Sequence, residues 1–229
     1  MVHRFFRLLG CLGLTAALAC AAPSPELSRA LADFRAAPPA GWAFTQVTVS
    51  EDKNLTERYD PSRPPEERWT LLEKDGRRPT EADLATYREQ PGKRGGELVA
   101  PDLTAQLDAD TAELVSDDGD RAVWRFRLRP GNDEDFVAAH MTATYTLHRP
   151  TGSIERVELA NFEPFDPSFF VKVNEARTVM EFTLPEGDRP ARPRQISMRV
   201  RGRSFWFKSL DSELSVTYRD YEAKPAAVP

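Results

Sequence analysis

Two histidines are the first residues to consider for catalysis, because a Ser-His-Asp or Cys-His group needs an imidazole beside its nucleophile. Beyond the first 21 residues only His140 and His148 are present, and both lie in or next to one predicted strand. Eight residues apart on a strand, they share a face but are separated by about 26 Å. The sequence also lacks a Gly-x-Ser-x-Gly motif. We therefore expect a protein that is not an enzyme.

Clustered carboxylates are the second candidates, since oxygen ligands bind calcium and paired carboxylates hydrolyse glycosides. Asp117, Asp118 and Asp120 form one cluster, and residues 133–135 form another. Neither has the regular spacing of a calcium loop. With 36 aspartates and glutamates in the chain, close pairs carry little information. We expect tight turns here, with no metal and no cofactor.

Two arginine stripes alternate with apolar residues on two predicted strands. They are Arg125, Arg127 and Arg129 on one strand and Arg199, Arg201 and Arg203 on the other. Such stripes bind lipid phosphates or an acidic partner, or they form a solvated face whose charges pair with carboxylates. Glu155, Glu181 and Glu213 are available as partners. We expect the paired, solvated face, because cross-strand charge pairs commonly stabilise sheets.

Aromatic side chains are the remaining candidates for a binding site. Those that fall on predicted strands or their ends, and that we select as ligand-binding candidates, are Trp42, Phe44, Trp69, Trp124, Phe126, Phe165, Phe169, Phe182 and Phe205. Most aromatic residues of a domain this size belong to its core. The connection 161–170 holds four phenylalanines with Pro164 and Pro167, and proline disfavours regular strand pairing. We expect this connection to close the core or to form an apolar rim at a lipid entrance.

The elements that position these residues are a helix followed by many strands. A helix is predicted over Glu26–Ala36, with Ser24 as its cap, and a second helix is predicted from Thr80 to near Gln90. The glycines that follow, in 91–96, indicate a loop. The predicted strands begin near Trp42 and continue as Leu55–Tyr59, Glu67–Leu72, Trp124–Leu128, Met141–His148, Ser153–Phe162, Phe169–Leu184, Gln195–Phe207 and Glu213–Tyr221.

Short turns between these strands predict antiparallel neighbours. Residues 117–120 and 150–152 are typical of tight hairpin turns, and residues 186–193 predict a looser one. Several strands are long, so the sheet should twist and curl. The predicted fold class is α+β: a strongly curved antiparallel sheet forming an incomplete barrel, with two or three short helices covering its concave face.

The first residues of the chain have the order of a secretory signal peptide. Basic residues in Met1–Arg7 precede the apolar run Leu8–Leu18, which is about half the ~20 residues that a membrane-spanning helix needs. We predict a signal peptide over residues 1–21 and a single domain over 22–229, exported to the periplasm with no transmembrane segment. Alternatively, Ala17-Leu18-Ala19-Cys20 resembles a lipoprotein cleavage motif, and Cys20 would then anchor the protein to a membrane.

Composition limits the partners. Hydrophobic residues make up 40% of the chain and charged residues 29%, which indicates a folded domain. Loss of Arg4 and Arg7 with the leader would lower the formal charge from -5 to about -7, and a mildly acidic protein is a poor match for nucleic acid. Both cysteines lie in the predicted leader, so we expect no disulfide framework.

The order of exported leader, amphipathic helix, long strands and mid-chain helix resembles the lipoprotein-carrier fold. Local similarities are Arg68-Trp69-Thr70-Leu71-Leu72, Asp75-Gly76, Pro79-Thr80, and the closing stretch 216–221. Members of that group are the periplasmic carrier of outer-membrane lipoproteins, its membrane-anchored acceptor, and the amino-terminal domain of an anti-sigma-factor regulator. The resemblance implies an incomplete barrel whose concave apolar face takes acyl chains.

We therefore expect non-catalytic binding of an apolar or amphipathic ligand, a lipid or lipoprotein, in the bacterial envelope. The alternative is a protein-interaction or sensor module of the envelope that uses the same sheet without a lipid. A hydrolase is a third and weaker hypothesis.

Overall fold

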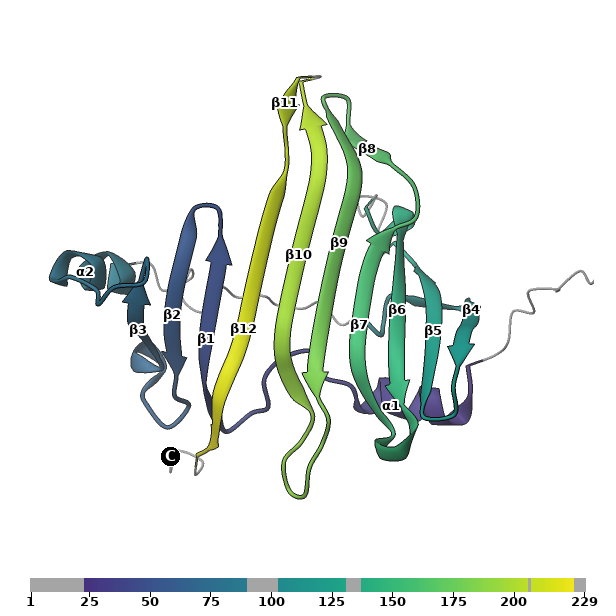
Figure 1. Ribbon diagram of the computed structural model, residues 1–229, viewed down its shortest axis with the longest axis horizontal. Helices are drawn as coiled ribbons and strands as arrows, with labels where there is room; N and C mark the ends of the chain where they lie inside the picture. The colour runs from purple at the N-terminus through teal and green to yellow at the C-terminus, as the bar shows by residue number, and fades with distance from the viewer. Residues whose placement is uncertain (1–22, 90–102, 131–136, 206, 225–229) are drawn as a thin grey trace, which may run out of the picture.

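The computed structural model describes residues 23–89, 103–130, 137–205 and 207–224 (Figure 1). The predicted leader at 1–21, including Cys20, and the predicted loop at 91–96 lie outside these residues. No helix within the described ranges is long and apolar enough to cross a membrane.

The first helix, α1 (Pro25–Asp33), begins where the sequence indicates. The Ser24 hydroxyl accepts a hydrogen bond from the Leu27 backbone N–H at 3.1 Å, and Pro25 needs no donor at the first helical position. The helix ends earlier than predicted because Phe34 adopts an extended backbone. That turn brings the Phe34 ring edge-on against Phe182, 5.0 Å between centroids. The helix therefore ends where Phe34 packs against the sheet, several residues before Pro38 and Pro39.

The second helix, α2 (Glu81–Glu89), starts with a reciprocal cap. The Asp83 N–H donates to the Thr80 hydroxyl at 3.2 Å, while the Thr80 N–H donates to the Asp83 carboxylate at 3.0 Å. A hydrogen bond from Lys74 to this carboxylate, together with the bonds from Thr80, holds the pKa of Asp83 well below its usual range. The helix packs against β3 (Trp69–Lys74).

One antiparallel sheet accounts for most of the structure. Its other strands are β1 (Trp42–Ser50), β2 (Lys53–Tyr59), β4 (Leu107–Asp117), β5 (Arg121–Leu128), β6 (Met141–His148), β7 (Ser153–Asn161), β8 (Phe165–Ser168), β9 (Val171–Thr183), β10 (Arg192–Ser204), β11 (Lys208–Ser209) and β12 (Ser212–Ala223). The order across the sheet is β3-β2-β1-β12-β10-β9-β7-β6-β5-β4, as Figure 1 shows from left to right.

The sheet is open, because β3 and β4 stand at opposite ends of this order and do not pair with each other. All the pairings within it are antiparallel, and β1 joins the two ends of the chain by pairing with β12. A mostly antiparallel sheet with two short helices is thus confirmed. The predicted hairpin turns before β5 and before β7 are also present.

The two faces of the sheet differ in chemistry. On the face against which α1 packs, here called the α1 face, apolar side chains alternate inward along β5 and β6. Its buried centre includes Trp124, Phe126, Leu147, Met180 and Ile196. One carboxylate, Glu57 on β2, is fully buried and accepts a hydrogen bond from the Tyr87 hydroxyl at 2.7 Å. The opposite face carries the arginines and is here called the arginine face.

Two strands differ from the sequence-based expectation. The connection 161–170 contains β8, which pairs with β9 through Phe165 to Val173 and Ser168 to Val171. Proline was expected to exclude regular pairing in this connection, and the pairing is irregular, with a register shift between these two pairs around Pro167. β4 was not predicted at all, because its residues are mostly acidic or exposed and only Ala112 is buried.

Candidate functional site

The aromatic residues predicted to bind ligand divide among separate parts of the fold. Phe44 and Trp69 form one cluster on the α1 face, where the Phe44 ring lies 5.7 Å from Trp69 and 5.1 Å from Tyr59. Trp42 lies at the start of the same strand, with the Arg192 guanidinium 5.8 Å from its ring. Burial raises the pKa of the neighbouring Tyr218 to about 12. These rings pack mainly against one another.

A second group lies beneath α1. Trp124, Phe126 and Phe182 are all buried, and Phe126 and Phe34 both meet Tyr145 edge-on at 6.1 Å between centroids. These rings are separated from the Phe44 cluster by the intervening strands β10 and β12. The predicted residues of the two groups therefore do not line one common site.

The last three predicted residues lie toward the far end of the sheet. Phe165 is buried and stacks on the His140 imidazole, 5.0 Å between centroids. Phe169 and Phe205 are exposed, at 80% and 54%. Among the described residues, no group of three or more histidine, cysteine, aspartate or glutamate side chains is arranged to hold a metal ion.

Ion pairs cover the arginine face in a regular pattern. Arg121 donates to Glu155 at 2.6 Å, and Glu181 accepts from both Arg156 and Arg194. Further pairs join neighbouring strands: Arg125 to Glu113, Arg129 to Asp108, and Arg199 to Glu213. The predicted pairing of a stripe arginine is found for Arg199 with Glu213, whereas Glu155 and Glu181 pair with arginines outside the two stripes. Arg127 differs, since its guanidinium lies 4.9 Å over the Phe162 ring.

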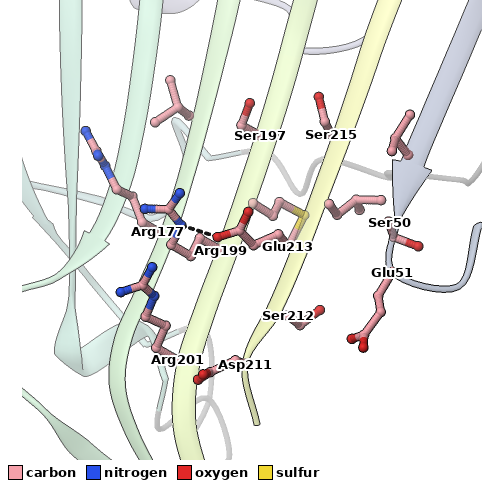
Figure 2. A pocket seen from close by; sticks show the side chains of 14 residues that line it. Ser50, Glu51, Arg177, Ser197, Arg199, Arg201, Asp211, Ser212, Glu213 and Ser215 are labelled. Atoms are coloured by element: carbon pink, nitrogen blue, oxygen red, sulfur yellow. Dashed lines mark ion pairs between the residues drawn. The ribbon is translucent and has the colours of Figure 1, made fainter.

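A hollow interrupts this charged face over β9, β10 and β12. It measures about 710 Å³, and Figure 2 shows the side chains around it. Val179, Ser197 and Ser215 contribute small side chains to its lining. Because these residues are short, the surrounding arginines enclose a space instead of packing over a large side chain. Those arginines are Arg177, Arg199 and Arg201, and the carboxylates of Glu51, Asp211 and Glu213 line the same hollow.

Strand register brings the arginines together. Arg199 on β10 is directly opposite Arg177 on β9, and Arg201 follows two residues later on the same face of β10. Two like charges placed opposite each other repel unless other groups compensate them. Glu158 compensates Arg177 by accepting two hydrogen bonds, at 2.8 and 3.0 Å. Those bonds hold the pKa of Glu158 below its usual range.

A second hollow of about 740 Å³ adjoins the first and shares Arg201 and Asp211 with it. Arg203, Asn174 and Ser209 also line it, and it reaches Phe207 near the end of the β10–β11 hairpin. The two hollows together, called here the arginine hollow, follow β10 from Ser197 to Arg203.

Available hydrogen-bond donors increase toward the outer part of the arginine hollow. Arg199 is held by Glu213 at 2.9 Å, whereas the nearest Arg201–Glu175 pair is 3.8 Å apart, too long for a hydrogen bond. Arg203 makes no ion pair or side-chain hydrogen bond with any described residue. Guanidinium groups two residues apart on a strand, with a hydroxyl and an amide nearby, suit a carboxylate or a phosphate.

Sequence reasoning found part of this site. It singled out Arg199, Arg201 and Arg203, but it missed Arg177, Ser197 and Ser215. The predicted hairpin could have revealed Arg177. If the two long predicted strands are paired outward from a loop near 186–193, Arg177 lies opposite Arg199.

No family model, curated protein or solved structure matches this chain.

Proposed function

We propose that this protein binds, without converting it, an amphipathic ligand with an anionic headgroup, a lipid or a lipoprotein-like molecule. The observation that carries the proposal is the arginine hollow, in which Arg201 and Arg203 are not held by carboxylates at hydrogen-bonding distance. An anion there gains charge-assisted hydrogen bonds without first displacing a bound side chain. This places the headgroup away from the aromatic residues selected by sequence, most of which pack in the core.

The setting belongs to the same proposal. We infer an exported protein of the bacterial periplasm, with a sheet curved like an incomplete barrel and short helices on its concave face. The open antiparallel sheet and the resemblance to the lipoprotein-carrier fold support this, because a sheet of this length coils rather than staying flat. Half-buried apolar residues packed against the core, Leu159, Ala176, Met198 and Leu214, offer a place for an acyl chain, and Met198 and Leu214 also line the arginine hollow.

Titration with a short-chain phosphatidylglycerol below its micelle concentration tests the proposal, with the matching phosphatidylcholine as the neutral reference. We expect the anionic lipid to bind more tightly, and Arg201→Gln to weaken its binding about tenfold, since a hydrogen bond to a charged group contributes about 1.5–3 kcal/mol. Arg125→Gln is the matched control, because Arg125 lies on the same face but outside the hollow.

Two results would count against headgroup binding in the hollow. One is an equal affinity for the two lipids, and the other is an equal loss of affinity in Arg201→Gln and Arg125→Gln. Native mass spectrometry of the protein purified from the periplasm adds a test under natural conditions. Bound lipid supports the proposal.

A clean mass without ligand would favour the second candidate, an envelope protein-interaction or sensor module. The burial of these rings in two packed groups, Phe44 with Trp69, and Trp124, Phe126 and Phe182 beneath α1, favours that candidate, because such rings fill a core. In that case the arginine hollow would take an acidic segment of a protein partner.

A further inference from the structure

Four exposed phenylalanines gather at the outer end of the longest strands. Phe169, Phe170, Phe205 and Phe207 are exposed at 80%, 49%, 54% and 87%. They come from two segments, the turn between β8 and β9 and the turn between β10 and β11, which lie at the top of Figure 1. Exposed apolar residues scattered singly are ordinary, but a contiguous group marks an interaction surface. These four residues with Lys172, Arg203 and Lys208 are called here the aromatic tip.

The aromatic tip is an ordered arrangement. The Phe205 backbone N–H donates to the Phe170 carbonyl at 2.7 Å, which joins the two turns. The rings of Phe170 and Phe205 stack with centroids 5.2 Å apart, and Phe169 meets Phe170 edge-on at 5.0 Å. Phe205 has a φ of +49°, in the left-handed region that bulky residues rarely adopt. Backbone strain of this kind clusters at functional sites, and here it fixes an exposed ring.

The charges of the aromatic tip are all positive and unpaired. Residues 167–174 and 202–210 contain Lys172, Arg203 and Lys208 but no aspartate or glutamate. None of these three side chains makes an ion pair or a side-chain hydrogen bond with a described residue. The adjoining carboxylates, Asp166, Glu175 and Asp211, flank the tip. Aromatic rings surrounded by free cations match the interface of a membrane with anionic headgroups.

We propose that the aromatic tip docks onto the surface of a bilayer that contains anionic lipids. The apolar rings enter the boundary between headgroups and acyl chains, where phenylalanine side chains of interfacial segments are buried, and the three cations meet lipid phosphates. A stable protein interface requires about 800 Å² from each partner. Four phenylalanines with these exposures offer less than that, since each ring buries at most about 250 Å². The end of the two hairpins is therefore better suited to insertion into the headgroup region of a bilayer than to a stable contact with another protein.

Docking goes beyond the proposed function and does not depend on it. Phe207 nevertheless lines the outer part of the arginine hollow. A protein docked through its aromatic tip would therefore hold Arg203 and Arg201 facing the lipid headgroups. The two proposals together describe a protein that takes its ligand at a membrane surface.

Co-sedimentation with vesicles tests the docking. The vesicles consist of phosphatidylcholine alone or mixed with phosphatidylglycerol, and every variant carries the same amino terminus. We expect wild-type protein to bind the mixed vesicles and Phe169→Ser/Phe207→Ser to bind at least about tenfold more weakly, because burial of one ring contributes a factor of about ten. Val115→Ser, an exposed apolar residue on β4, is the matched control and should bind like wild type.

The cations have their own test. Lys172→Gln/Arg203→Gln/Lys208→Gln should lose the preference for phosphatidylglycerol, and added salt should reduce wild-type binding in the same way. Arg29→Gln on α1 removes an exposed cation elsewhere and should leave the preference unchanged.

Three results would overturn the proposal: wild-type protein that ignores mixed vesicles, an equal loss in Val115→Ser, or wild-type oligomers that dissociate in Phe169→Ser/Phe207→Ser without any vesicle binding. The last would make the tip a contact between copies of this chain. Failure of docking is separable from failure of the proposed function, because monomeric short-chain lipid reports on the hollow alone.

Discussion

The arginine face and the aromatic tip use the same two strands, β9 and β10, but treat charge in opposite ways. In the middle of the sheet Arg177 is held by Glu158 and Arg199 by Glu213. Toward the outer end the Arg201 pair lengthens to 3.8 Å, and Arg203 and Lys172 have no partner among the described residues. Charges that pair across strands stabilise the sheet, whereas charges left unpaired are available to a ligand or a surface.

The two regions meet at Gly202. Here the pairing of β9 with β10 shifts register, and the backbones approach so closely that a Cβ on Gly202 would lie 2.3 Å from the Lys172 carbonyl oxygen. The pairing continues in the new register through Arg203 with Lys172 and Ser204 with Val171, and these pairs lead into the aromatic tip. Backbone geometry thus separates a structural region from one that is open to partners.

Breaking that junction should have the largest effect. Gly202→Ala places a methyl group against a backbone carbonyl, which cannot move aside as a flexible side chain would. We expect the free energy of unfolding, measured by urea denaturation, to fall by about 2 kcal/mol. Ser215→Ala on β12 should change it by less than about 0.5 kcal/mol. An unchanged stability in Gly202→Ala would mean that the close approach of the strands does not persist in solution.

Removing a shared carboxylate from the paired region should have the next largest effect. Glu158→Gln takes away the acceptor of hydrogen bonds from Arg177 and Arg156. We expect the free energy of unfolding to fall by about 1 kcal/mol, a modest value because the arginines are partly exposed to solvent. Lys172→Gln at the tip is the matched comparison and should cost less than about 0.5 kcal/mol. Equal losses would remove the distinction between the two regions.

Acid should abolish the difference between wild type and Glu158→Gln. Arg177 lowers the pKa of Glu158 in the folded protein relative to about 4.3 in the unfolded chain. The carboxylate therefore contributes its full stabilisation above pH 4.3 and loses it as the pH falls through the folded pKa. Urea denaturation between about pH 7 and pH 3 should show the gap closing. The smaller gap for Lys172→Gln should not close in this way, because that substitution removes no carboxylate.

The sequence predicts best those strands that bury one row of side chains in the core and leave the other row facing solvent. β5 and β6 alternate buried apolar side chains with half-buried or exposed ones, so the pattern predicts both bounds of β6 and the end of β5, although β5 begins at Arg121, before the predicted Trp124. β4 buries only Ala112, and its run of acidic and exposed residues carries no such alternation. β8 contains Pro167, a residue that argues against a strand unless a register shift makes room for it.

The candidate site was less predictable because it depends on register. The position of Arg177 opposite Arg199 and the short side chains of Ser197 and Ser215 create the hollow only when β9, β10 and β12 are aligned. Composition likewise cannot separate Phe182, which is buried beneath α1, from Phe169, which lies in the turn before β9 and stays exposed. Whether a phenylalanine ring is buried depends on its position in the fold: rings in the turns at the ends of the hairpins face solvent, although they are as hydrophobic as those in the core.

Removing the exposed rings should have the smallest effect on stability. Phe169→Ser/Phe207→Ser replaces side chains that are 80% and 87% exposed, so little apolar burial is lost. We expect the free energy of unfolding to change by less than about 0.5 kcal/mol, against a loss of about 3–5 kcal/mol for the buried Phe126→Ala. A loss above about 1 kcal/mol would show that the tip rings hold the β9–β10 end together, and would assign them a structural role. Retained stability together with lost vesicle binding would instead identify them as a surface kept for a partner.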